Sequence, residues 1–186
     1  MKRELIKNGI MIGLIILFAC FVTYKIYYKF HEERAIDYSS KSLDIVFHEK
    51  TGDKIFIDKL VPLTDNLGLS SKPYTFTVSN NLTEDVSFKI KLIRDEEEID
   101  LDKCSDKLIS EKYLKVSIKD DSNKTKIYNM EELKDDVLLD AKIKALEENT
   151  YTVRVWVKDD VESTDTDLHY HGKLQIVEDN NILARR

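Results

Sequence analysis

The segment PYTFTVSN, residues 73–80, alternates apolar and polar side chains and decides how the rest of the chain is interpreted. Successive side chains of a β-strand point to opposite faces, so the apolar residues of this segment share one face. Those residues are Tyr74, Phe76 and Val78. The segment VSFKIKL, residues 86–92, repeats the alternation. Both segments predict strands with one buried face, and the polar stretch 80–85 between them predicts a hairpin turn.

Further alternating segments lie on both sides of this pair. They are residues 42–48, 54–61, 114–119, 151–158 and 172–177. Residues 51–53, Thr-Gly-Asp, predict a second hairpin between the first two. The segments 106–112, 130–135 and 137–146 suit short helical turns and strands equally. About seven to nine short strands with one apolar face predict a mainly β chain, folded as an antiparallel β-sandwich of jelly-roll or immunoglobulin-like type.

Residues 9–28, GIMIGLIILFACFVTYKIYY, form an apolar stretch whose length suits a membrane. A helix rises ~1.5 Å per residue, so about 20 residues cross the ~30 Å hydrocarbon core of a bilayer. Tyr24, Tyr27 and Tyr28 lie at the C-terminal end of the stretch, where aromatic rings favour the headgroup region of a bilayer. The stretch predicts one N-terminal transmembrane helix, with the lipid bilayer as its partner.

The short leader before this stretch favours an uncleaved, single-pass signal anchor with its N-terminus in the cytoplasm and its C-terminal domain outside the cell membrane. No small-residue cleavage site follows the apolar stretch. The alternative is a lipoprotein, because residues 17–20, Leu-Phe-Ala-Cys, resemble a bacterial lipobox that would lipidate Cys20. Cys20 and Cys104 belong to different parts of the chain, so no disulfide is expected, which suits a bacterial surface.

The sequence is therefore expected to divide into five parts. They are a cytoplasmic leader (1–8), a transmembrane signal anchor (9–28), a juxtamembrane linker (29–41), an extracytoplasmic β-sandwich domain (42–178) and a charged tail (179–186). Residues 31–186 contain 24 Lys and Arg against 34 Asp and Glu, an acidic excess that repels nucleic acid. The acidic segments 95–102 and 159–167 predict solvated loops. The alternative is a calcium site with ligands such as Asp165 and Asp167.

Candidate functional residues are few, because the sequence contains neither a nucleophile motif nor a glycine-rich phosphate loop. His169 and His171 are two positions apart, which places both on one face of a strand, where they could bind a transition metal such as zinc. The other interpretation is a pair of ordinary surface or edge-strand histidines. The residues favour a protein that is not an enzyme and has no cofactor.

Trp156 is the only tryptophan, and it alternates with the valines of its segment. If the valines form the core, the indole faces outward with Arg154 and Lys158. Either neighbouring loops cover this face, or the three side chains form a contact patch for another subunit or surface protein.

The order of these segments resembles a known family. The segments 73–80 and 86–92, followed after a long middle part by residues 146–157 (LEENTYTVRVWV), are similar to extracellular proteins of Gram-positive bacteria related to camelysin and the TasA biofilm-matrix protein. The resemblance implies an exported, jelly-roll-like sandwich, and some members of the family polymerise into fibres. Camelysin-type members are grouped as peptidases, but no matching catalytic motif occurs here. The family's signal peptide is removed, whereas no cleavage site follows residues 9–28.

These observations predict a membrane-anchored, non-enzymatic, extracytoplasmic protein for cell-surface adhesion, matrix or envelope assembly. Two alternatives stay open. One is a camelysin-like, metal-dependent peptidase that uses His169 and His171. The other is an accessory subunit of a membrane complex.

Overall fold

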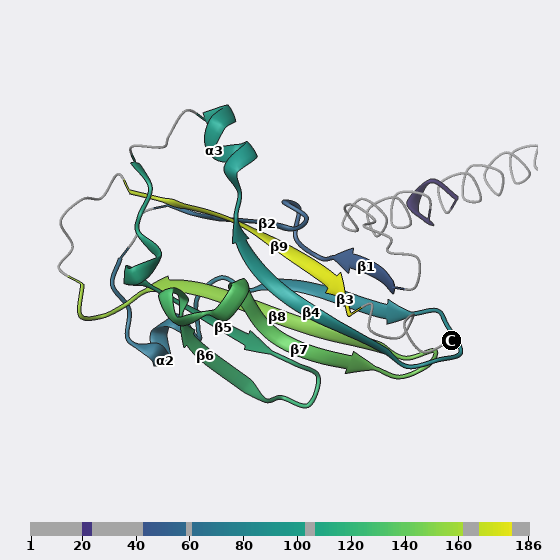
Figure 1. Cartoon of the computed structure of the whole chain (residues 1–186). Coiled ribbons are helices and arrows are strands. Elements are labelled where there is room, and N and C mark those ends of the chain that lie inside the picture. Colours follow the sequence, from purple (N-terminus) through teal and green to yellow (C-terminus); the bar gives the residue numbers. More distant parts are fainter. Residues whose placement is uncertain (1–19, 24–42, 59–60, 103–106, 162–167, 180–186) are drawn as a thin grey trace, which may run out of the picture.

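The computed structural model describes residues 20–23, 43–58, 61–102, 107–161 and 168–179. Nine strands of this described part form two antiparallel sheets that face each other around one hydrophobic core (Figure 1). The predicted mainly β, antiparallel fold is confirmed. We call these two sheets the two-sheet domain.

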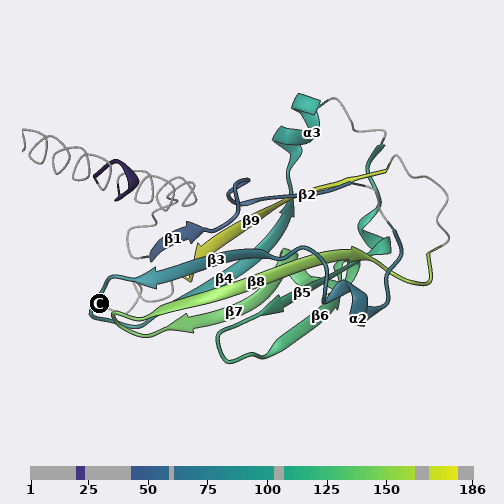
Figure 2. The same ribbon diagram turned by 180° about the vertical axis from the view of Figure 1, so that it is seen from behind.

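The strands are distributed unevenly between the sheets. The five-stranded sheet has the order β1 (Leu43–Phe47), β3 (Tyr74–Asn80), β8 (Glu148–Val157), β5 (Leu114–Lys119) and β6 (Thr125–Asn129). The four-stranded sheet has the order β2 (Lys54–Ile57), β9 (Tyr170–Glu178), β4 (Val86–Arg94) and β7 (Val137–Ile143). Most consecutive strands therefore belong to different sheets, which Figure 2 shows from behind.

Both predicted hairpins are wrong for this reason. β1 pairs with β3, placing Phe47 opposite Phe76, whereas β2 pairs with β9 in the other sheet. Residues 51–53 and 80–85 turn the chain, as their composition indicates, but each turn carries it across the core to the opposite sheet. Turn residues specify that the chain reverses and do not specify which strand becomes its neighbour.

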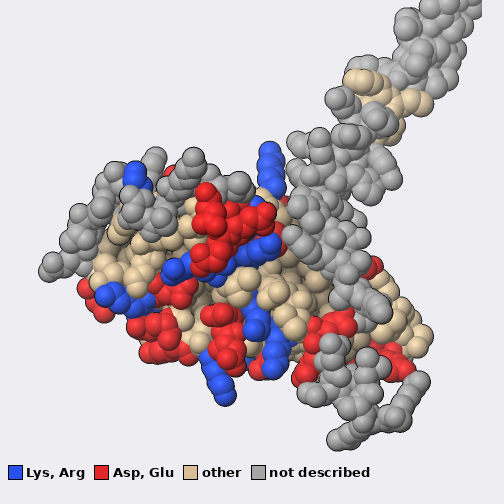
Figure 3. Space-filling model, turned by 45° about the horizontal axis from the view of Figure 1, so that its top comes forward, with Lys and Arg blue, Asp and Glu red and all other residues tan. Residues whose placement is uncertain are grey.

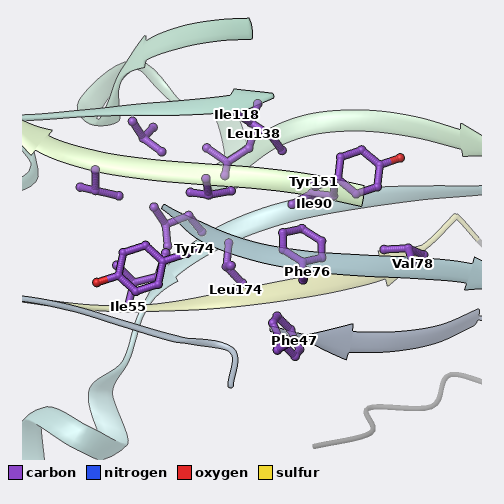
Figure 4. Packing of buried hydrophobic residues seen from close by; sticks show 14 of the residues in the cluster. Phe47, Ile55, Tyr74, Phe76, Val78, Ile90, Ile118, Leu138, Tyr151 and Leu174 are labelled. Carbon is purple, nitrogen blue, oxygen red and sulfur yellow. The ribbon is translucent and has the colours of Figure 1, made fainter. Parts of the chain in front are cut away.

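The core is built from the apolar faces that the alternation predicts. Phe76 lies between Phe47 and Tyr151, with ring centroids 5.5 and 5.6 Å away (Figure 4). Phe88 of the facing sheet meets Tyr151 edge-on at 6.1 Å. Aromatic pairs at these separations add stabilisation to the burial of their area. The two sheets are held together by this shared core.

The undecided and acidic segments also take definite forms. Residues 130–135 enter two 3-10 turns, Met130–Glu132 and Lys134–Asp136, whereas residues 137–143 are strand β7. The acidic segment 95–102, expected to be a loop, contains helix α3 (Glu96–Asp102). Asp95 begins this helix, because its Oδ1 accepts a hydrogen bond from the Glu98 N–H at 3.3 Å.

The two ends of the two-sheet domain differ. β1 begins at Leu43, which lies opposite Asn80, so the chain enters at the end formed by the β3–β4 and β7–β8 connections. We call this the entry end. The opposite end carries α2 (Asp65–Gly68) and α3, and we call it the helix end (Figure 1).

Little of the N-terminal part is described. Residues 20–23 are helical, and the Thr23 hydroxyl donates to the Cys20 carbonyl at 3.0 Å. Among the described residues, no helix has the length and apolar character needed to cross a bilayer. The rest of the predicted anchor 9–28, the leader 1–8, the linker 29–41 and all but one residue of the tail lie outside the described residues.

Candidate functional site

A hollow opens at the helix end, where β8 extends beyond β3. The last paired residues are Tyr74 and Val153, and β8 continues to Val157. There the Leu63 N–H donates to the Val157 carbonyl at 3.0 Å, so a different segment takes over the edge of β8. Between these two contacts, beside Val155, lies a cavity of about 270 Å³. We call it the β8 hollow.

Most side chains that line the β8 hollow are apolar or aromatic. They are Phe56, Ile57, Val61, Leu63, Tyr74, Val155, Trp156 and Val157, with Asp58, Ser71 and Lys72 as the polar members. Phe56 is 46% exposed and Val61 is 62% exposed, so apolar surface continues outward from the cavity. A concave apolar site with a few polar groups is the usual form of a binding pocket.

The indole of Trp156 forms part of this wall and is only 2% exposed. Helix α2 covers it, because a Cβ built on Gly68 would lie 2.3 Å from Cδ2 of the ring. The helix is held down by Lys115, whose Nζ contacts Asp65 Oδ1 at 2.7 Å. Of the two interpretations of this face, the covered indole is therefore confirmed.

The other two predicted contact residues secure neighbouring loops. Arg154 Nε donates to the Ser71 carbonyl at 3.2 Å, and Lys158 Nζ contacts Glu131 Oε1 at 2.9 Å. Arg154 thereby holds the segment that supplies one polar wall of the β8 hollow. A role of Trp156, Arg154 and Lys158 in contacts with another protein remains a prediction.

Two polar atoms of residues in this wall are buried without a hydrogen-bond partner in the described structure. They are Trp156 Nε1 and Ser71 Oγ. Tyr74, in contrast, donates its hydroxyl to the Phe56 carbonyl at 2.7 Å, and burial raises its pKa. A buried polar group left unpaired costs about 1–3 kcal/mol, so each of these two atoms lowers the stability of the fold.

The predicted metal residues lie elsewhere, on the outer face of the four-stranded sheet. His169 and His171 share that face, with ring centroids 5.0 Å apart, and the ring of Phe56 lies 4.9 Å from that of His171. Beside His171 is a cavity of about 200 Å³ that Asp95 and Glu98 also line. The predicted common face is confirmed, but His171 is only 4% exposed and is not an ordinary surface histidine.

The surroundings of this histidine pair are acidic. Glu98 pairs with Lys54, and this hydrogen bond lowers the pKa of Glu98. Asp95 is 3% exposed, and its Oδ2 has no hydrogen-bond partner among the described residues. Figure 3 shows acidic side chains gathered beside basic ones on the face that comes forward in that view.

In the described ranges, no three His, Cys, Asp or Glu side chains are arranged to hold a metal ion. Zinc at His169 and His171 therefore remains a prediction. The calcium candidates Asp165 and Asp167 lie outside the described residues. Cys20 is exposed on its helical turn, and its lipidation is untested.

Sequence reasoning did not find the β8 hollow. Ser71 and Leu63 lie in connections without alternation, whereas Phe56 and Val61 belong to the segment 54–61, which alternates as an ordinary strand. The outward position of Trp156 was the one available signal, but it did not indicate a cavity. No protein family, curated protein or solved structure matches the chain.

Proposed function

We propose that this chain is a membrane-anchored, non-enzymatic β-sandwich protein that acts outside the cytoplasm in surface adhesion, matrix or envelope assembly. Residues 9–28 would be the signal anchor, and the acidic domain would bind other surface proteins or further copies of itself. The repeated crossing of consecutive strands between sheets supports the jelly-roll type of sandwich. The likeness to camelysin and TasA belongs to this proposal.

One observation carries the proposal. The chain enters the two-sheet domain at Leu43, and the β8 hollow lies at the opposite end, beside Val157. A linker of residues 29–41 reaches at most about 45 Å when fully extended. An anchor in residues 9–28 would thus keep the entry end near the bilayer and direct the helix end away from it, toward potential partners.

Protease treatment of intact cells tests the topology. A C-terminal epitope tag should disappear when protease is added to cells whose outer wall has been opened, while a cytoplasmic reporter stays intact. Carbonate extraction should leave the uncut protein in the membrane. A tag that is protected until the cells are lysed would contradict the proposed orientation.

The lipoprotein alternative is separated from the signal anchor by Cys20→Ser. A lipidated protein would incorporate labelled fatty acid only with Cys20 present, and the substitution would prevent maturation. For a signal anchor we expect no label and no change in membrane attachment.

The closeness of His169 and His171 to the acidic cavity favours one second candidate, a metal-dependent peptidase. Metal analysis of the purified full chain and a casein assay with and without chelator test it. Bound metal and chelator-sensitive cleavage, both lost in His171→Ala, would support the peptidase. Absence of both in the unmodified protein would rule it out.

A further inference from the structure

We propose that strand β6 pairs with β6 of a second copy of this chain, antiparallel and centred on Ile127. This inference rests on the proposed function, because it names how further copies of the chain would bind. It draws on three features of β6: its position at the edge of a sheet, the symmetry of its residues about Ile127 and the opposite charges beside its two ends.

Strand β6 lies at one edge of the five-stranded sheet, and both ribbon views show it along the border of the two-sheet domain (Figure 1, Figure 2). In the described part of the chain, β5 is the sole strand that pairs with it. An edge strand presents backbone N–H and C=O groups with which another strand can pair. Ile127, in the middle of β6, is 38% exposed, so apolar surface accompanies these backbone groups.

The length of β6 determines the register. Antiparallel self-pairing keeps the cores of both copies on the same side of the joined sheet only if one residue lies opposite its own copy. Because β6 has five residues, the register centred on Ile127 is the only one of this kind that pairs all of them. It places Ile127 opposite Ile127 of the second copy, and Thr125 opposite Asn129.

Lys126 and Tyr128 lie on the inner face of β6. Their partners on β5 are the buried residues Ile118 and Val116, and directly paired residues share a face. In the proposed register Lys126 lies opposite Tyr128 of the second copy, where an ammonium group is attracted to an aromatic ring. Lysines on edge strands oppose pairing when they meet one another, as they would in a register centred on Lys126. The register centred on Ile127 avoids this.

Opposite charges lie beside the two ends of β6. Lys124 precedes its first residue, whereas Glu131 and Glu132 follow its last, and all three are exposed. Antiparallel pairing brings the basic start of one strand next to the acidic end of the other. Parallel pairing would bring like charges together. Charge complementarity therefore favours a second copy of the chain in the antiparallel sense.

The symmetry of this pair has a consequence for the anchors. Because the two β6 strands run antiparallel, the entry ends of the two copies point in opposite directions. In the proposed function each entry end faces the bilayer of its own copy, so the two bilayers lie on opposite sides of the pair. The contact therefore links copies on facing surfaces, as adhesion requires.

Sedimentation velocity of the full chain, with one copy in each phosphatidylcholine nanodisc, measures the pairing. Strands of five residues make a contact far smaller than a standard interface, so we expect a weak dimer that forms as the protein concentration rises. Phosphatidylcholine vesicles that display many copies on their outer surface should cluster, because many weak contacts act together. Light scattering records the clustering.

Charge substitutions at Ile127 test the register. Ile127→Lys places two lysines opposite each other and should weaken the dimer about tenfold or more, and Ile127→Glu should do the same. An equal mixture of the two variants should pair again, because lysine then lies opposite glutamate. Val177→Lys is the control, since Val177 is 37% exposed on β9 of the other sheet, and it should leave the dimer unchanged. Circular dichroism verifies that each variant is folded.

Four results would overturn the inference. They are a protein that stays monomeric at every concentration, a dimer that Ile127→Lys leaves intact, equal weakening by Val177→Lys, and a mixture of the two Ile127 variants that pairs no better than either alone. Dimeric nanodiscs without clustering of vesicles would contradict the link between facing surfaces. Because purified protein is used, a failed topology assay with intact pairing overturns only the proposed orientation.

Discussion

Gly68 lies directly against the indole of Trp156, and a Cβ at this position would come within 2.3 Å of the ring. The indole is buried, and α2 is held by the ion pair Lys115–Asp65, so a shift of either group to accept a larger side chain is costly. We expect Gly68→Ala to lower the free energy of unfolding by about 2 kcal/mol, through overpacking. Urea denaturation followed by Trp156 emission measures this. Asn66→Ala, an exposed position in the same helix, is the control and should cost less than ~0.5 kcal/mol.

Asn80 ties two connections together at the entry end. Its amide nitrogen donates to the Glu84 carbonyl at 2.7 Å and the Lys144 carbonyl at 3.0 Å, and its Oδ1 accepts from the Leu82 N–H. Asn80→Asp would point a carboxylate at two carbonyls, so we expect a loss of about 3 kcal/mol at neutral pH.

Thermal unfolding at two pH values tests this prediction. The loss of stability caused by Asn80→Asp should be smaller at pH 3, where the carboxyl is partly protonated and regains a hydrogen-bond donor. An equal loss of stability at both pH values would mean that the hydrogen bonds donated by the Asn80 amide do not account for it. Asn66→Asp, at an exposed position in α2, provides the comparison.

Tyr170 and Tyr74 respond differently to loss of their hydroxyls. The Tyr170 hydroxyl is buried without a partner in the described structure, whereas that of Tyr74 donates to the Phe56 carbonyl at 2.7 Å. Tyr170→Phe should leave stability unchanged or raise it by up to ~1 kcal/mol, and Tyr74→Phe should lower it by about 1 kcal/mol. Parallel denaturant titrations measure the change in unfolding free energy of each variant. A larger loss of stability for Tyr170→Phe than for Tyr74→Phe would contradict the assigned contacts.

Buried phenols make the fold sensitive to alkali. Burial raises the pKa of Tyr74 and Tyr170, and raises that of Tyr151 to about 12. The folded state therefore holds these protons more tightly than the unfolded state, whose phenols ionise near pH 10. The contribution of the three protonated phenols to the free energy of unfolding should be fully present below about pH 10. It should be lost as the pH rises through the raised pKa values.

Denaturant midpoints between pH 8 and 12, with phenolate absorbance recorded in parallel, test this. Tyr170→Phe removes one of the three groups. The free energy of unfolding should then fall with pH less steeply, by about 1.4 kcal/mol per pH unit. Phenolate absorbance from these tyrosines should appear together with unfolding. Their ionisation in a folded protein would be the contrary result.

Strand positions were predictable because a strand that is buried on one face alternates apolar and polar residues along its sequence. Tyr74, Phe76 and Val78 alternate and are all buried, as the pattern indicates. Strand β6 was missed, because it is an edge strand with mainly exposed residues and needs no alternation. Strand neighbours could not be predicted either, since pairing depends on three-dimensional partners up to 119 residues away, as between Lys54 and Lys173.

The candidate site was predictable only in part. The shared face of His169 and His171 follows from strand periodicity and was correct. The burial of Trp156 depends on α2, a four-residue helix too short to leave a periodic signal. The β8 hollow arises where β8 extends beyond its neighbour β3. The ends of a strand are the part of it that a sequence pattern predicts least well.

Among the described pairings, only β5 and β6 join strands that are consecutive along the chain. The last strand, β9, lies between β2 and β4, and it is the sole partner of β2. During synthesis, the four-stranded sheet therefore cannot close until Tyr170–Glu178 has emerged, and β2 must wait for more than a hundred residues. Folding is late and dominated by distant contacts, which makes it slow. A nascent chain whose four-stranded sheet stays open until β9 has emerged is well suited to being threaded through a narrow pore before it folds.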